Sequence, residues 1–160
     1  MVAKQVRVLE FSVEEPEIVV EQMDRLGEAH RGWINLGPLL PPEQEPPPPT
    51  GLDLMFSLSV HDVPVCTWVA GKVRRRGVEP DSLGVQHSAG TKAIAHLGSL
   101  GVQLPRDWRP AQDHPRRGLV VLPPPGTGHA EELAWLIQAG AALSRVKVTG
   151  KWRAQVHDAR

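Results

Sequence analysis

The sequence predicts an α+β fold, in which one domain holds a mixed β-sheet of five to six strands and about three helices packed mainly on one face. The chain has 160 residues, close to the usual size of one domain, so residues 1–160 are expected to form a single unit. Its hydrophobic content of 41% is enough for a core. Strand-like and helix-like segments follow in the order βαβββαβαβ, which combines hairpins with βαβ connections.

The N-terminal segment predicts a strand followed at once by a helix. Residues 4–11 are β-branched and apolar enough for a strand. Ser12 and Glu15 then fit a capping box, and apolar residues recur at helical spacing afterwards. We expect this helix to end at Gly27 or Gly32.

The middle of the chain predicts three strands and one proline-rich surface loop. Residues 33–36 form a short strand, and the proline-rich segment at about 37–51 is a surface loop, because proline has no backbone donor. Leu52–Val60 alternates most clearly between apolar and polar residues and pairs with Val63–Ala70 in a hairpin. Cys66 reads as a small buried hydrophobe, and as the single cysteine it excludes an intrachain disulfide and a cysteine-based zinc site.

The C-terminal half predicts two helices and two strands around one long loop. Thr127 is the expected N-cap of the stronger helix. The expected elements are a connection over 71–84, a helix from about 88 to 100, a structureless loop over 101–117, a strand over 118–122, a helix over 127–144 and a strand over 146–156.

The composition indicates where the protein is located and what kind of organism it comes from. No run approaches the roughly 20 apolar residues of a spanning helix, and the N-terminus has no apolar signal core, so we expect a soluble cytoplasmic protein without a membrane partner. Arginine outnumbers lysine 13 to 5, and tyrosine is absent. This usage is typical of GC-rich codons and indicates a bacterial source.

Charged residues are distributed unevenly along the chain, and the main functional hypothesis is based on this distribution. Residues 1–71 have four basic and eleven acidic residues, whereas 72–160 have fourteen basic and seven acidic ones. We expect a non-enzymatic binding protein that presents a basic strand and loop surface to nucleic acid or an acidic protein. The expected surface comprises Lys147, Lys151 and Arg153, extended by Arg116, Arg117 or Arg74–Arg76. The alternative is a solvated strand face that discourages edge pairing.

Loop 101–117 carries the second hypothesis, an enzyme or small-anion-binding domain. Asp113 could orient His114 as a base, and the arginines of the loop could clamp an anion. Residues adjacent in sequence need not have side chains that meet, so a purely structural loop is the alternative.

Trp135 carries the third hypothesis, a homodimer or an inhibitor-type protein. It shares a side of its helix with the polar residues Glu131, Glu132 and Gln138, which predicts partial exposure and a role as an interface anchor. The alternative is a helix that loops such as 101–117 bury on more than one side.

The segment LVVLPPPGTGHAEEL resembles a phosphate-binding loop but lacks its chemistry. His129 and Ala130 stand where the lysine and the Ser or Thr are needed, and Glu131 and Glu132 would repel a phosphate. The histidines show no metal-ligand spacing. The sequence therefore predicts neither a metal nor a cofactor.

Overall fold

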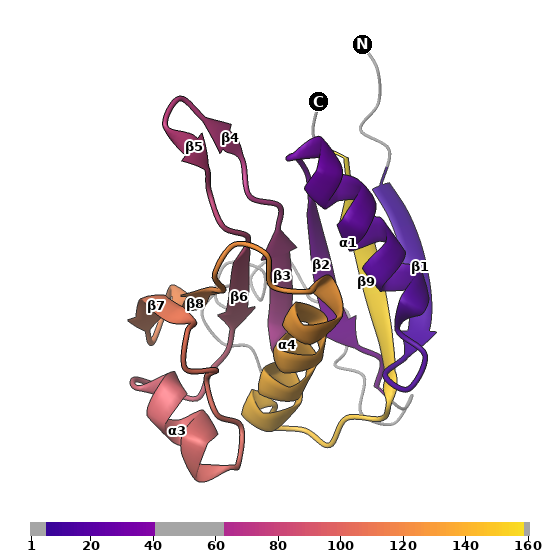
Figure 1. Cartoon of the computed structure of the whole chain (residues 1–160). Coiled ribbons are helices and arrows are strands. Elements are labelled where there is room, and N and C mark those ends of the chain that lie inside the picture. Colours follow the sequence, from indigo (N-terminus) through magenta and orange to yellow (C-terminus); the bar gives the residue numbers. More distant parts are fainter. Residues whose placement is uncertain (1–5, 41–62, 159–160) are drawn as a thin grey trace, which may run out of the picture.

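The structure is a computed structural model and describes residues 6–40 and 63–158. Its main element is a β-sheet in which neighbouring strands run antiparallel. The strands of the main sheet are β1 (Val6–Ser12), β2 (Trp33–Pro38), β3 (Val65–Val69), β6 (Ser82–Gln86), β7 (Arg109–His114), β8 (Gly118–Leu122) and β9 (Lys151–His157). Their order is β1-β9-β2-β3-β6-β8-β7 (Figure 1). The α+β class is confirmed, although the strands are more numerous than expected and the pairs are antiparallel rather than mixed.

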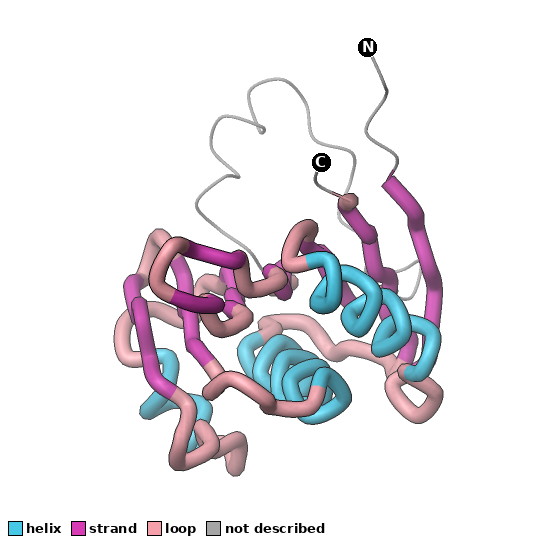
Figure 2. The backbone as a smooth tube through the Cα atoms, turned by 45° about the horizontal axis from the view of Figure 1, so that its top comes forward, coloured by secondary structure: helices cyan, strands magenta, loops and turns pink. Residues whose placement is uncertain are grey.

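Three helices accompany the sheet in the described part of the chain. They are α1 (Glu17–Ala29), α3 (Ala93–Ser99) and α4 (His129–Leu143). Helices α1 and α4 lie side by side on one face of the sheet, while α3 contacts α4 and β7 (Figure 2). None of the helices in the described residues is long and apolar enough to cross a membrane.

The core lies between these helices and alternate residues of the strands. Trp152, Ala154 and Val156 of β9 are buried, as the predicted alternation requires. Gly140 lets α4 approach the sheet closely, because a Cβ there would lie 2.6 Å from Cys66 Sγ and 3.0 Å from Trp152. Burial raises the pKa of the Cys66 thiol to about 12, which agrees with its predicted role as a small core residue.

Both predicted helix caps are wrong. Ser12 ends β1 and its carbonyl accepts from Glu15 N in a turn, so α1 begins after Pro16 without a side-chain cap. Thr127 lies one residue before the actual N-cap, Gly128, and its hydroxyl donates to Pro124 O at 2.7 Å. The Ser12 carbonyl and the Thr127 hydroxyl are thus both engaged in local turns instead of in a helix cap.

The boundaries of other predicted elements also shift. The last strand begins at Lys151 rather than 146, and loop 101–117 contains the edge strand β7. β7 includes Pro110 and shifts register between Pro110 and Gln112, which obscures its alternation. The predicted strand Leu52–Val60 and most of the proline-rich segment 37–51 lie outside the described residues.

Candidate functional site

A cavity of about 410 Å³ opens where α1, α4 and the connection before β6 meet. Five carboxylates and two histidines line it, together with prolines and glycines, and the described lining contains no lysine or arginine. The charged and titratable lining residues are Asp24, Glu28, Glu79, Asp81 and Glu132, with His30 and His129. Carboxyl groups therefore outnumber basic groups in the lining.

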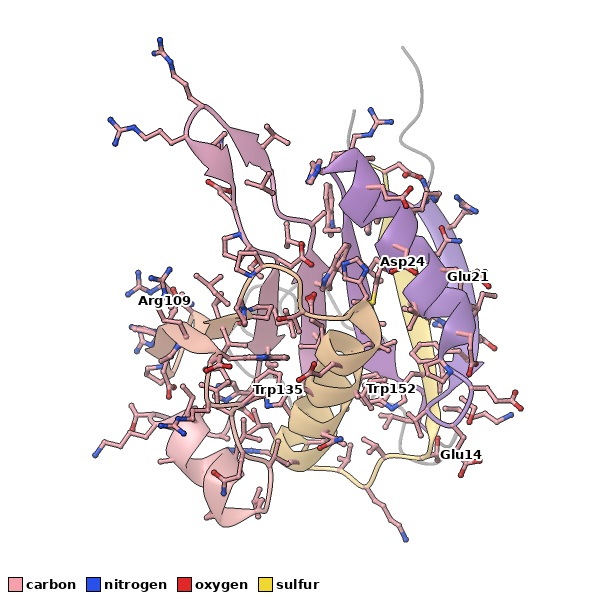
Figure 3. The ribbon with its side chains drawn as sticks, viewed as in Figure 1. Glu14, Glu21, Asp24, Arg109, Trp135 and Trp152 are labelled. Atoms are coloured by element: carbon pink, nitrogen blue, oxygen red, sulfur yellow. The ribbon has the colours of Figure 1, made fainter. Side chains whose placement is uncertain are left out.

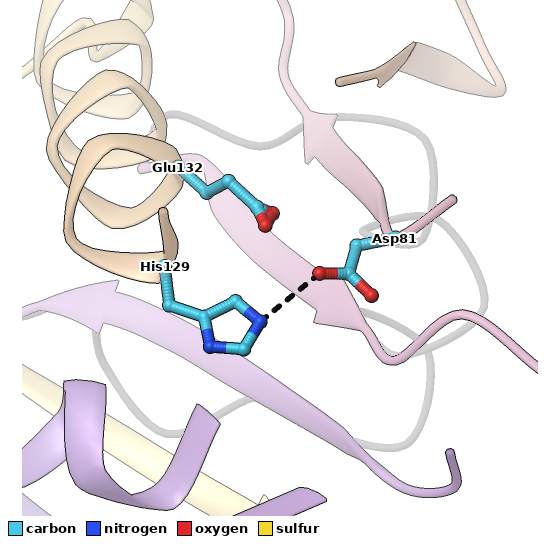
Figure 4. Close-up of side chains that lie close together, drawn as sticks. All are labelled: Asp81, His129 and Glu132. Carbon is cyan, nitrogen blue, oxygen red and sulfur yellow. Dashed lines mark hydrogen bonds and ion pairs between the residues drawn. The ribbon is translucent and has the colours of Figure 1, made fainter. Parts of the chain in front are cut away.

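Three of these side chains converge on one point. His129 and Glu132 are three residues apart in the first turn of α4, so they project from the same side of the helix. Asp81 immediately precedes β6 and approaches them from the sheet (Figure 4). One nitrogen or oxygen atom from each of the three lies within 4.8 Å of the others.

His129 lies between two carboxylates. Its Nδ1 donates to Asp24 Oδ1 at 2.6 Å, and its Nε2 donates to Asp81 Oδ2 at 3.2 Å. The hydrogen bond to Asp81 is the main cause that raises the pKa of His129 to about 9, with Asp24 adding to it and burial opposing it. Gly27 of α1 leaves room for the ring, since a Cβ there would lie 2.8 Å from His129 Cε1.

The backbone fixes the orientation of Asp81. The Gly71 amide donates to Asp81 Oδ1 at 2.7 Å, which leaves Oδ2 directed at His129. A side chain at Gly71 would collide with Glu79 O, 2.0 Å from the Cβ position. Burial pushes the pKa of Asp81 up, but hydrogen bonding with His129 and the interactions with Glu132 and Gly71 outweigh it, and the pKa is lowered.

Glu132 is the least expected member of the group. Glu132 is 1% exposed, and its Oε2 has no hydrogen-bond partner among the described residues. Burial, and after it a hydrogen bond with Asp81, raises the pKa of Glu132 to about 9, while the charge of His129 and a hydrogen bond with Trp68 oppose this shift. A buried carboxyl oxygen without a partner costs about 1–3 kcal/mol, so Oε2 needs an explanation that the hydrogen bond with Asp81 does not give.

The arrangement has the chemistry of a cation site. Proteins commonly hold a metal-ligating histidine by a carboxylate on its other ring nitrogen, and Asp24 occupies that position on His129. Once Nε2 of His129 gives up its proton to an incoming ion, it and the carboxylates of Asp81 and Glu132 can form a mixed nitrogen and oxygen donor set. The adjoining cavity leaves space for further ligands.

The predicted pair Asp113 and His114 has structural roles instead. The Asp113 carboxylate accepts from Ala93 N at 3.0 Å and from Ile94 N at 3.2 Å at the start of α3. His114 Nδ1 accepts from Arg116 N and Arg117 N in the turn after β7. The side chains bind separate backbone segments because neighbouring residues of a strand point to opposite faces.

The structure does not bring the predicted basic residues into one surface. Lys147 precedes β9, whereas Lys151 and Arg153 lie on β9, where Arg153 pairs with Glu10 at 3.0 Å. Arg116 and Arg117 lie in the β7–β8 turn, and β2, β3 and β6 separate that hairpin from β9. Binding of an anionic partner by these residues stays a prediction.

The expected exposure of Trp135 is wrong. The residue, which Figure 3 labels on α4, is 6% exposed. Its ring packs against Trp108 with ring centroids 5.5 Å apart, and its Nε1 donates to Gln103 O. Residues of segment 101–117 thus cover the outer side of α4, as the alternative interpretation proposed. An indole buried in this way cannot anchor a partner.

Sequence reasoning missed Asp81, His129 and Glu132 as a group. It treated Glu132 as a charge at a helix N-terminus, although Glu132 lies one turn before the fully buried Leu136 and so falls near the core face. That spacing was the available signal. No protein-family model, curated protein or solved structure matches the chain, so its own geometry is the basis for interpreting the site.

Proposed function

We propose that the protein binds a divalent transition-metal ion through Asp81, His129 and Glu132 and is a metal-dependent enzyme of the hydrolytic type. The observation that carries the proposal is the buried Oε2 of Glu132, which lacks a partner among the described residues and belongs to a group directed at Asp81 and His129. A cation is the simplest partner for such a group.

The donor set selects the kind of ion. Carboxylate oxygens suit magnesium, calcium and manganese, whereas imidazole nitrogen suits zinc, iron, nickel and copper. One imidazole with two carboxylates therefore favours Mn²⁺, Fe²⁺, Co²⁺ or Zn²⁺ over Mg²⁺ and Ca²⁺. Asp24 supports this function by holding the imidazole from its far side.

Three protein ligands and an adjoining cavity are typical of catalytic rather than structural metal sites. A bound ion supplies Lewis acidity, which activates water and polarises the group under attack. The chain supplies the positioning: Asp24 orients His129, the Gly71 amide orients Asp81, and Pro123–Pro125 form part of the cavity wall.

Metal titration of chelator-treated protein tests the proposal. We expect Mn²⁺, followed by electron paramagnetic resonance, and Zn²⁺, followed by calorimetry, to bind wild-type protein at one site. Glu132→Gln keeps the size of the side chain and should weaken binding at least tenfold, and Asp24→Asn should weaken it about 10–100-fold. Asp113→Asn is the matched control and should bind like wild type, because Asp113 serves only α3.

Two results would overturn the proposal. One is wild-type protein that binds neither ion at millimolar concentration. The other is Glu132→Gln protein that binds both ions as tightly as wild type. Circular dichroism of each variant separates loss of the ligand from loss of the fold.

A second candidate function is the predicted binding of an anionic partner by Lys147, Lys151 and Arg153. The exposure of all three residues favours it, although Arg153 is engaged with Glu10. Replacing the three by alanine should abolish salt-dependent binding of that partner without unfolding the protein. The cytoplasmic location and the homodimer also stay predictions.

A further inference from the structure

A short β-hairpin stands out from the body of the protein. It consists of β4 (Val73–Arg74) and β5 (Gly77–Val78), which pair outside the main sheet (Figure 1). Both valines are exposed, at 61% and 55% of their surface. The hairpin therefore contributes little to the core and presents its own surface to solvent.

The tip of this hairpin is basic. Arg74 pairs with Glu79 at 2.7 Å, whereas Arg75 and Arg76 form the exposed turn and make no ion pair within the described residues. Two arginines at a turn repel each other and gain nothing from the fold. Their guanidinium groups are free to donate two hydrogen bonds each to an external anion.

The base of the hairpin is firmly held. Glu79 N donates to Lys72 O at 2.9 Å, and Gly71 N donates to Asp81 Oδ1 at 2.7 Å. The backbone of Gly71 packs directly against the Glu79 carbonyl. Because these contacts order the base, a ligand of the tip meets a preformed arm.

We propose that the β4–β5 hairpin is an arm that binds the backbone of duplex DNA through Arg75 and Arg76. This inference does not rest on the metal site. A two-stranded ribbon fits the major groove of B-DNA, and phosphate contacts need only a few well-placed guanidinium groups.

The shape of the arm argues against the other anionic partners. Specific protein interfaces and sequence-specific DNA interfaces both bury about 600 Å² or more of protein surface, so a short tip suits contacts to the phosphate backbone alone. Single-stranded nucleic acids bind on aromatic platforms, and residues 72–79 contain no aromatic side chain. The major groove of A-form RNA is too narrow for a ribbon.

The acidic cavity at the base limits how far the DNA can extend. Val78 and Glu79 belong both to the hairpin region and to the cavity lining, so the repulsive carboxylates begin directly below the arm. We therefore expect about two phosphate contacts, confined to the tip. Such an interface predicts a slope of about −2 in a plot of log K against log salt.

Fluorescence anisotropy with a labelled duplex DNA, at several salt concentrations and with chelator present, tests the inference. Wild-type protein should bind at low salt with the slope given above. Arg75→Ala/Arg76→Ala should reduce affinity at least tenfold and remove most of the salt slope. The matched control is Arg7→Ala/Arg145→Ala, which removes the same charge from exposed positions on β1 and after α4 and should bind like wild type.

The outcomes that contradict the inference are clear. Wild-type protein that does not bind duplex DNA at low salt would overturn it, and so would equal losses in the two arginine pairs. Tighter binding of single-stranded RNA or of poly-glutamate would assign the arm to a different partner. Because chelator is present throughout, these outcomes are independent of the metal titration.

Discussion

Two aspartate–histidine pairs in the described residues, Asp113–His114 and Asp81–His129, differ in what their polar atoms contact. Asp113 and His114 are neighbours in β7, and each accepts hydrogen bonds from backbone amides. Asp81 and His129 are 48 residues apart, and their side chains bond to each other beside a cavity. The pair that looks like a site in the sequence is structural, and the pair that forms a candidate site comes from distant segments.

This difference shows how the two kinds of polar cluster can be told apart. Backbone amides at a helix start or a turn need acceptors whatever the protein does, and Asp113 and His114 supply them. The second cluster leaves Glu132 buried without a partner for Oε2 among the described residues, which lowers stability without a compensating hydrogen bond. The following predictions test this distinction through stability, measured by urea unfolding of metal-free protein.

The largest expected effect is the pH dependence of stability. The pKa values of His129 and Glu132 are both raised in the folded state, to about 9. The pH-dependent contribution of each group is therefore most favourable below its unfolded-state pKa and is lost as the pH rises toward 9, where a buried Glu132 must ionise and His129 must lose its charge. Because these neighbouring groups share protons, we expect a net loss of roughly 2–3 kcal/mol between pH 6 and pH 9.

His129→Gln should remove much of that pH dependence, while His114→Gln should leave it unchanged. Equal unfolding free energies at pH 6 and pH 9 for wild-type protein would contradict the proposed coupling. The lowered pKa of Asp81 acts at the other end of the scale, since its contribution is lost only as the pH falls below about 4.

The next effect is a gain in stability when the unpartnered carboxyl is removed. Glu132→Met fills a similar volume without a buried polar atom, and we expect the free energy of unfolding at pH 7 to rise by about 1–2 kcal/mol. Glu132→Gln, which keeps a polar group, is the control and should gain less. A clear loss of stability in Glu132→Met would indicate that Glu132 serves the fold.

Asp113→Ala should lower the free energy of unfolding, in contrast to Glu132→Met. It removes the acceptor of two amides at the start of α3, and we expect a loss of about 1 kcal/mol. Asp113→Asn should restore part of this loss, because an amide oxygen still accepts. A stability equal to wild type in Asp113→Ala would weaken the contrast between the two pairs.

The smallest effect is expected at His114. His114→Ala removes an acceptor for two turn amides that water can replace at the surface, so the loss should be about 0.5 kcal/mol. Metal titration of this variant should match wild type. A weakened metal site in His114→Ala would show that the two regions are coupled.

Much of the fold could be predicted from the sequence because its signals are local. The apolar periodicity of α1 and α4 and the alternation of Trp152, Ala154 and Val156 are visible within single segments. β6 and β7 were missed for a physical reason. β6 contains Gly84 and β7 contains Pro110 and a register shift, and these features weaken the alternation that identifies a strand.

The candidate site could not be predicted in the same way. His129 and Glu132 lie on one helix turn, but Asp81 reaches them only because β6 and α4 pack together. Asp24 joins them from α1. Sequence spacing carries no information about such tertiary contacts. The burial of Glu132, in contrast, could have been predicted from the helix period, because Glu132 lies one turn before Leu136.

Pro110 also determines how the sheet ends. β7 is an outer strand of the described sheet, and its proline has no amide to donate to a further strand. The register shift beside Pro110 bends the strand and interrupts the row of backbone groups. A second chain that added a strand here would meet an incomplete ladder. An interrupted edge of this kind disfavours the addition of a strand from a second copy of the chain.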